Sequence, residues 1–216
     1  MEKLVSRSDT IVPLGFGNAQ NYIKAIEYLA NKENDFYEVL SKGAYEAAEK
    51  YGGQDYAMTF AKNEMPGYHT GYGALVGTVV GARHSHLCNG GYSIDQALKT
   101  LDKNKIVEEI FNEEKERCML NSLTICLFAR KVYDRKTILT ALNAIGYELT
   151  DDDLTAIADR VYKTKLRIKN MLGFDLTKVR LPKRLFETPS LWGKMDEALA
   201  YEMIDMYDKK LREFMK

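Results

Sequence analysis

The chain has 216 residues, of which 45% are hydrophobic, and its 31 lysines and arginines balance its 31 aspartates and glutamates. This length can bury a substantial core, while zero net charge provides no field that favours nucleic acid or an anionic membrane. No apolar stretch approaches the ~20 residues of a membrane-spanning helix, no secretory signal opens the chain and the three cysteines include no CxxC pair, so a reduced, cytoplasmic protein is expected.

The first quarter of the chain is expected to be helical after an irregular start. Residues 1–17 contain a proline and two glycines that break regular structure. Asn18 is predicted to cap a helix whose apolar residues recur at helical spacing. Asp35, with Glu38 three residues later, resembles a capping box and predicts a second helix that continues to the pair Gly52-Gly53.

A stripe of small residues marks the next predicted helix. Gly73, Gly77 and Gly81 recur every fourth residue and Ser85 continues the series, which places them on one helical face. Each glycine inside a helix costs roughly 1 kcal/mol relative to alanine, so the stripe needs a compensating reason. We expect another backbone, or a large flat ligand, to come very close to this face.

A long helical pattern runs through residues 103–130, preceded by Ser93 and Gln96 as a second capping box. A break is expected at Asn121–Cys126, where β-branched residues weaken the helix. The charge-dense segment Glu108–Arg117 within this pattern is interpreted as a solvated helix face.

Further helices are predicted at Thr137–Ile145, after the cap formed by Thr150 and Asp153, and from about Asp196 to Phe214. Convincing strand alternation is absent from the sequence. The predicted fold is therefore mainly α, an irregular multi-helix protein.

All three histidines lie in or beside the glycine-rich stretch. His86 is a candidate proton donor or acceptor, because an imidazole titrates near neutral pH, and the alternative is a hydrogen-bonded structural histidine. His84 and His86 point to different helical faces and do not close a metal site by themselves. A metal site that also uses His69 remains an alternative.

Cys126 and Glu64 are the other candidate site residues. Cys126 is interpreted either as a thiolate ligand for iron or zinc, or as a small buried hydrophobe. Cys118, about two helical turns earlier, is interpreted as core. Glu64 precedes a proline-containing loop, where a carboxylate either anchors the loop by accepting backbone N–H bonds or acts as an acid or base.

The order of local motifs resembles the C-terminal part of the tungsten-containing aldehyde:ferredoxin oxidoreductase family. The family's "KGxExPxY" loop, small-residue helix and terminal "HL" correspond to Lys62–Tyr68, Gly73–Ala82 and His86-Leu87. Its "DxxGLC" segment corresponds to Asn121–Cys126. Similar pieces then follow in the same order, namely Leu142–Gly146, Arg160–Tyr162, Arg167–Gly173 and Leu181–Leu185.

The resemblance implies roles for five residues. His86 would lie near the tungsten and transfer protons as aldehyde and water become carboxylate, and Glu64 would belong to the loop before the active-site helix, with a chemical or a structural role. Asn121 and Thr124 would contact the pterin. Cys126 would be the fourth ligand of a [4Fe–4S] cluster.

The resemblance also implies the organisation of the protein. Residues 1–61 would be a helical segment resembling the end of the family's middle domain, and residues 62–216 the C-terminal helical domain. The glycine stripe would allow close approach of a neighbouring chain or cofactor. The sequence contains no CxxCxxxC and no β-rich domain to hold a bis-pterin.

This chain alone is therefore expected to bind neither a cluster, which needs four ligands, nor tungsten or molybdenum. The implied partners are an N-terminal domain or subunit with CxxCxxxC, an aldehyde and a ferredoxin-like acceptor, and a homo-oligomer remains open. Two departures from the family pattern, Asn121 for aspartate and Thr124 for glycine, favour an alternative, a non-catalytic helical binding or scaffold module.

Overall fold

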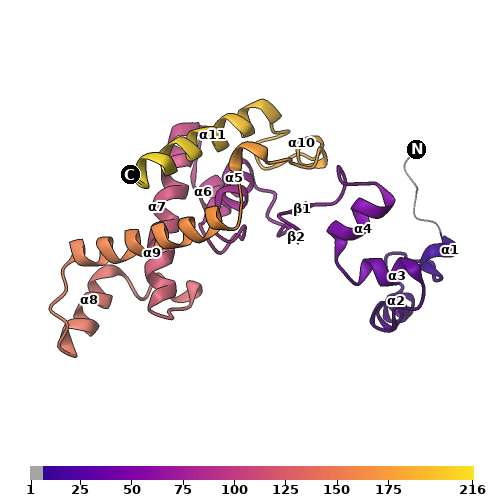
Figure 1. The fold of residues 1–216 in the computed structure, drawn as a ribbon, viewed down its shortest axis with the longest axis horizontal. Coiled ribbons are helices and arrows are strands. Elements are labelled where there is room, and N and C mark those ends of the chain that lie inside the picture. The colour runs from indigo at the N-terminus through magenta and orange to yellow at the C-terminus, as the bar shows by residue number, and fades with distance from the viewer. Residues whose placement is uncertain (1–6) are drawn as a thin grey trace. The chain divides into compact units, whose positions relative to one another are not determined.

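The computed structural model describes residues 7–216 and is built mainly of helices (Figure 1), which confirms the predicted fold class. The helices are α1 (Arg7–Thr10), α2 (Ala19–Asn31), α3 (Asp35–Leu40), α4 (Ala44–Tyr51), α5 (Tyr72–Val80), α6 (Gly91–Ala97), α7 (Lys103–Ser122), α8 (Arg135–Ala144), α9 (Asp151–Met171), α10 (Arg184–Glu187) and α11 (Glu197–Phe214). Two short 3₁₀ helices, η1 (Leu127–Ala129) and η2 (Leu176–Lys178), and two paired strands, β1 (Thr59–Phe60) and β2 (Asn63–Glu64), complete the described elements.

The chain divides into two compact units. The first comprises Met1–Met65 with Arg180–Glu187, and the second comprises Pro66–Val179 with Thr188–Lys216. The late segment joins the first unit because Arg180 and Lys183 form ion pairs with Asp55, whose carbonyl also accepts a hydrogen bond from the N–H of Arg184. A sequence boundary after residue 61 does not anticipate this return of the chain.

Helix α2 begins as predicted, since the Asn18 side chain accepts a hydrogen bond from the N–H of Asn21. The prediction of one helix from Asp35 to the glycine pair was wrong. Two helices form instead, separated at Gly43, whose φ of 108° is incompatible with a continuing helix. Of the irregular start, residues 7–10 form α1, and residues 1–6 lie outside the described part of the chain.

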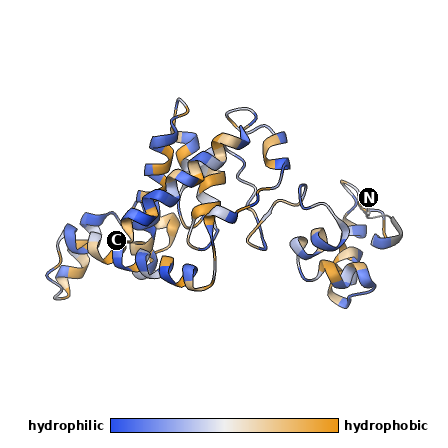
Figure 2. Ribbon diagram, turned by 45° about the horizontal axis from the view of Figure 1, so that its top comes forward, coloured by the Kyte–Doolittle hydropathy of each residue, from blue (hydrophilic) through white to orange (hydrophobic). Residues whose placement is uncertain are grey.

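The core of the second unit lies where α5, α7, α9 and α11 meet: α7 packs against both α9 and α11, and α11 also packs against α5 (Figure 1). Hydrophobic and hydrophilic residues interleave along these helices, as amphipathic packing requires (Figure 2). Four aromatic rings, those of Phe111, Tyr162, Tyr207 and Phe214, pack against one another at the centre. Within residues 7–216, none of the helices combines the length and the apolar composition of a membrane-spanning segment.

The glycine stripe of α5 is filled by the chain's own segment 88–95. A Cβ on Gly73 would meet the carbonyl oxygen of Gly91 at 2.6 Å, and one on Gly77 would meet Oδ1 of Asn89 at 2.3 Å. The predicted close approach of another backbone is thus accounted for within the chain. Ser85 is not part of the stripe, because the helix ends at Val80.

The expected capping box of Ser93 and Gln96 was wrong, because α6 already begins at Gly91. The carboxylate of Asp95 instead caps α5, accepting hydrogen bonds from the N–H groups of Gly73 and Ala74, both at 2.8 Å. Thr70 donates a third hydrogen bond to it at 2.9 Å. Since α5 has no cap from its own flanking residues, this contact joins α5 to α6 and satisfies the helix end.

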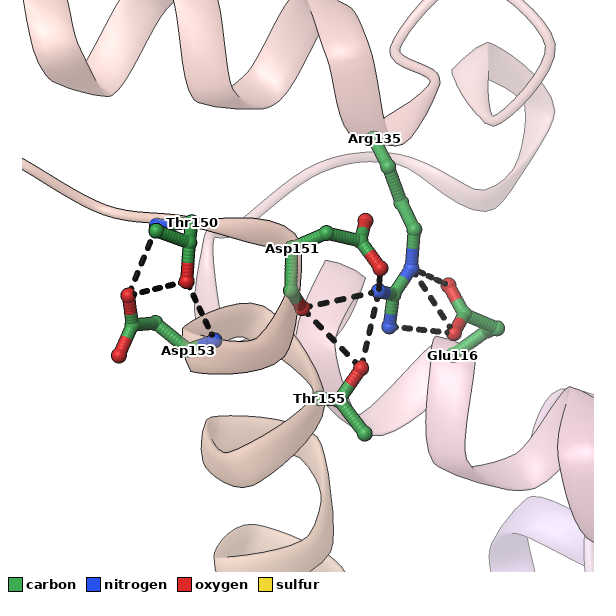
Figure 3. A network of polar contacts seen from close by, with 6 residues as sticks. All are labelled: Glu116, Arg135, Thr150, Asp151, Asp153 and Thr155. Carbon is green, nitrogen blue, oxygen red and sulfur yellow. Dashed lines mark hydrogen bonds and ion pairs between the residues drawn. The ribbon is translucent and has the colours of Figure 1, made fainter.

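A hydrophobic cluster that includes Ile138, Met119 and Leu154 packs α8 against α7 and α9, and one arginine adds polar contacts to both (Figure 3). The Arg135 guanidinium donates to Glu116 on α7 at 2.8 Å and to Asp151 on α9 at 2.7 Å. Beside it, Thr150 and Asp153 exchange the hydrogen bonds of the predicted capping box, which is confirmed. The capping box therefore sets where α9 begins, and Arg135 holds the start of α9 next to α7.

Helices α7, α8 and α9 end in the same Schellman motif, in which one residue takes the left-handed conformation. That residue is Gly146 after α8 (φ 99°) and Gly173 after α9 (φ 81°). After α7 it is Thr124 (φ 56°), while the N–H of Ile125 donates to the carbonyl of Leu120 at 3.0 Å. A β-branched residue is strained in this conformation, so the end of α7 is under local strain.

Replacing Thr124 with glycine is expected to raise the free energy of unfolding by about 1 kcal/mol, since relief of left-handed strain exceeds the entropic cost of glycine. Chemical denaturation would measure the change. The matched control is Gly173→Thr, at the equivalent position with no atom within 4 Å of an added Cβ, which should destabilise by about the same amount. If Thr124→Gly and Gly173→Thr both raised, or both lowered, the free energy of unfolding by the same amount, this explanation would be contradicted.

Candidate functional site

A cleft of ≈ 310 Å³ lies in the second unit at the C-terminal end of α7. It is lined by Arg83, Leu87, Arg117, Leu120, Asn121, Ile125, Cys126, Leu127 and Phe128. The fold thus brings together Asn121 and Cys126, two of the three residues predicted to bind a cofactor. Thr124 does not line the cleft, and its exposed side chain lies in the turn between them.

Cys126 is the exposed member of the three cysteines, and it lies immediately before η1. Cys118 is buried, as its interpretation as core requires, and its sulfur accepts a hydrogen bond from the Lys165 ammonium at 3.3 Å. Cys88 is also buried, and its sulfur accepts the N–H of Arg83. A cysteine ligand contributed by this chain to a shared cluster would therefore have to be Cys126.

His86 lies in the turn between α5 and α6, beside the cleft. Its ring is 5.1 Å from the ring of Tyr68, and both line a separate narrow hollow of ≈ 10 Å³. Burial and the neighbouring Arg117 charge lower the pKa of His86, so its imidazole is neutral at pH 7 and able to accept a proton.

The other two histidines hold structure through backbone contacts. A ring nitrogen of His84 lies 3.0 Å from the Val79 carbonyl oxygen and its ring packs on Phe174, where burial lowers its pKa to about 4. A ring nitrogen of His69 lies 2.8 Å from the Thr188 carbonyl oxygen. Among residues 7–216 no three histidine, cysteine or carboxylate side chains gather to hold a metal ion.

Glu64 lies in the first unit, on the two-residue strand β2 and opposite Thr59. Its side chain is exposed. His86 and the cleft belong to the second unit.

Sequence reasoning missed two buried charged residues on α7. Glu114 and Arg117 were interpreted as part of a solvated face, but they are 1% and 2% exposed. Both lie at helical spacing from Ile110, which is completely buried. That spacing is the signal that could have found them.

Glu114 and Lys169 form a buried polar centre beneath the end of α5. The Glu114 carboxylate accepts hydrogen bonds from the N–H of Ala82 at 2.7 Å and from Asn89 at 3.3 Å, and burial raises its pKa to about 7. The Lys169 ammonium donates to the carbonyl of Gly81 at 3.0 Å, and burial lowers its pKa to about 8. The two side chains therefore pair with backbone N–H and C=O groups just beyond the C-terminal end of α5.

The cleft does not fit a complete iron–sulfur cluster. Such a cluster is held by four ligands, usually cysteines, and the described residues offer one exposed thiol, Cys126. The arrangement fits a single ligand donated to a group held mainly by other residues.

Comparisons with known proteins show which family this chain is similar to. The family model "Aldehyde ferredoxin oxidoreductase, domains 2 & 3" matches residues 1–214. Tungsten-containing aldehyde ferredoxin oxidoreductases of Pyrococcus horikoshii and Pyrococcus abyssi are 26% identical over 196 residues, and that of Thermococcus kodakarensis is 25% identical over 191. Each alignment covers 82% of this chain and 31% of the relative, so the chain spans about a third of the relatives' length. No solved structure gave a significant match.

Proposed function

The chain belongs to the aldehyde ferredoxin oxidoreductase family, and on this premise we propose that it is the C-terminal helical part of an enzyme that oxidises an aldehyde to a carboxylate. The relatives are tungsten enzymes roughly three times as long as the aligned region, so the remaining part would come from an N-terminal domain or subunit. Electrons would pass to an iron–sulfur carrier such as ferredoxin.

One observation carries the proposal: the exposed thiol of Cys126 shares a cleft with Asn121 and Arg117, beside the turn that holds His86. A bis-pterin complex of tungsten or molybdenum and a [4Fe–4S] cluster would supply the two-electron chemistry, with an N-terminal partner contributing the remaining cluster ligands. Cys126 would be this chain's ligand. Asn121 would offer an amide oxygen as an acceptor for pterin N–H groups, and Thr124, in the same segment, would contact the pterin from the turn.

His86 would take up a proton during the reaction. Conversion of an aldehyde and water to a carboxylate releases two electrons and three protons, so the site needs a proton acceptor. The lowered pKa of His86 leaves its imidazole neutral and suited to that role. Glu64, exposed in the first unit, would either anchor the loop before α5 or act as a second acid–base group.

Anaerobic co-expression with an N-terminal chain of the family that carries CxxCxxxC tests the proposal. A brown complex that contains iron is expected. A complex without iron would instead support the alternative of a non-catalytic helical module, which the strained Thr124 at a family glycine position favours.

Within that complex, Cys126→Ser is expected to lower cluster retention roughly 10–100-fold, since even outer-shell changes cost that much at metal sites. Iron analysis and visible absorbance would measure it. The control Cys118→Ser alters a buried thiol away from the cleft and should keep the cluster. Full retention by Cys126→Ser would refute its assignment as a ligand.

A further inference from the structure

Arg117 is a buried cation held by two contacts. Its side chain is 3% exposed, and its Nε donates to the Glu113 carboxylate at 2.8 Å. Its Nη1 donates to the backbone carbonyl of His86 at 3.1 Å. A buried charge is costly unless it is paired and hydrogen-bonded, so these contacts define where the guanidinium sits.

The turn that carries His86 lies against this guanidinium at a second point. A Cβ on Gly90 would meet Nη2 of Arg117 at 3.0 Å and the Glu113 carboxylate at 3.1 Å. The backbone therefore passes directly over the ion pair at Gly90 and is hydrogen-bonded to it at His86. Because α7 is buried along this face, the ion pair fixes the turn relative to the helix.

Arg117 also lines the cleft that contains Cys126. We propose that Arg117 is a positioning residue for His86: its guanidinium holds the backbone of the turn that carries the imidazole. The inference rests on the proposed function for its catalytic meaning, but the contacts and the charge effect are properties of this chain.

The Arg117 charge acts on the His86 ring, and the carboxylate of Glu113, the ion-pair partner of Arg117, lies against the same turn. Tyr68 packs on the imidazole ring of His86, and Tyr92 stacks on Tyr68 with 4.6 Å between their ring centroids. The rings that pack on this side of His86 are therefore aromatic. Burial and then the Arg117 charge lower the pKa of His86. Removing the cation favours the protonated imidazole, so the pKa should rise.

The test is a proton NMR titration of the full 216-residue chain, in which three histidines give three assignable ring signals. Arg117→Met is expected to move the titration midpoint of His86 to higher pH. Arg117→Lys keeps the charge, so the His86 midpoint should stay near that of the unaltered protein. It loses the planar fork, however, and the turn should open more often.

Hydrogen exchange measures that opening. The Cys88 N–H is bonded to the Ser85 carbonyl inside the turn, and its exchange should quicken roughly tenfold in Arg117→Lys, the fold-change for one charge-assisted hydrogen bond. The Ile106 N–H, at the start of α7, should not change. If Arg117→Met fails to fold, the Cys88 exchange rate in Arg117→Lys tests the proposal by itself.

Lys169→Met is the matched control, because burial and the Lys169 charge, not Arg117, lower the pKa of His84. It should move the His84 midpoint upward and leave His86 unchanged. The inference would be overturned by an unchanged His86 midpoint in Arg117→Met, or by unchanged Cys88 exchange in Arg117→Lys. The iron content of the co-expressed complex tests the proposed function independently of both results.

Discussion

Replacing Gly91 with alanine is expected to lower the free energy of unfolding of the second unit by about 3 kcal/mol, the upper range for overpacking a core. An added Cβ would lie 2.0 Å from the carbonyl oxygen of Gly73 and 2.5 Å from its carbonyl carbon. Both obstacles are backbone atoms of a buried helix and cannot rotate away. Helices α5 and α6 would have to separate, which would also pull Asp95 from the N-terminus of α5.

Urea denaturation followed by circular dichroism would measure this loss. Gly67→Ala is the control, because it lies in the same unit with no atom within 4 Å of an added Cβ. It should change stability by less than about 0.5 kcal/mol, as other surface substitutions do. If both variants behaved alike, close backbone packing would not be the reason for the glycine.

In the unaltered protein, Glu114 is expected to lower the free energy of unfolding by about 3 kcal/mol as pH rises from 4.5 to 7, at about 1.4 kcal/mol per pKa unit. Replacing Glu114 with glutamine should abolish this pH dependence. Burial raises the pKa of Glu114 from 4.5 to about 7, so the folded protein holds a proton that the unfolded chain releases. The contribution is therefore complete below pH 4.5 and is lost as pH rises to 7.

Denaturation of the two proteins at each pH would measure the difference between their profiles. The difference is needed because His84, whose pKa is lowered to about 4, contributes stability with the opposite slope over pH 4 to 6.5. Lys169 acts at higher pH, between about 8 and 10.5. Glu109→Gln, an exposed change on the same helix, is the control. Parallel profiles for Glu114→Gln and the unaltered protein would exclude a buried, protonated Glu114.

The helical class and several helix ends were predictable from the sequence because their causes are local. Asn18, Thr150 and Asp196 each accept a hydrogen bond from an N–H three residues later, so residue type and spacing suffice to find them. The failure at Ser93 has the opposite origin. Helix α6 begins at Gly91, before Ser93, and the carboxylate that caps a helix here, that of Asp95, acts across space on α5.

Residue patterns alone predict a mainly α chain of the aldehyde ferredoxin oxidoreductase family, and they predict that another segment packs closely on the face of Gly73 and Gly77. The three-dimensional fold was needed to show that this segment is the chain's own residues 88–95. It also decided that Glu114 and Arg117 are buried and that Cys126 opens into a cleft. These facts depend on contacts between residues far apart in the chain, whose burial and charge partners no local pattern specifies.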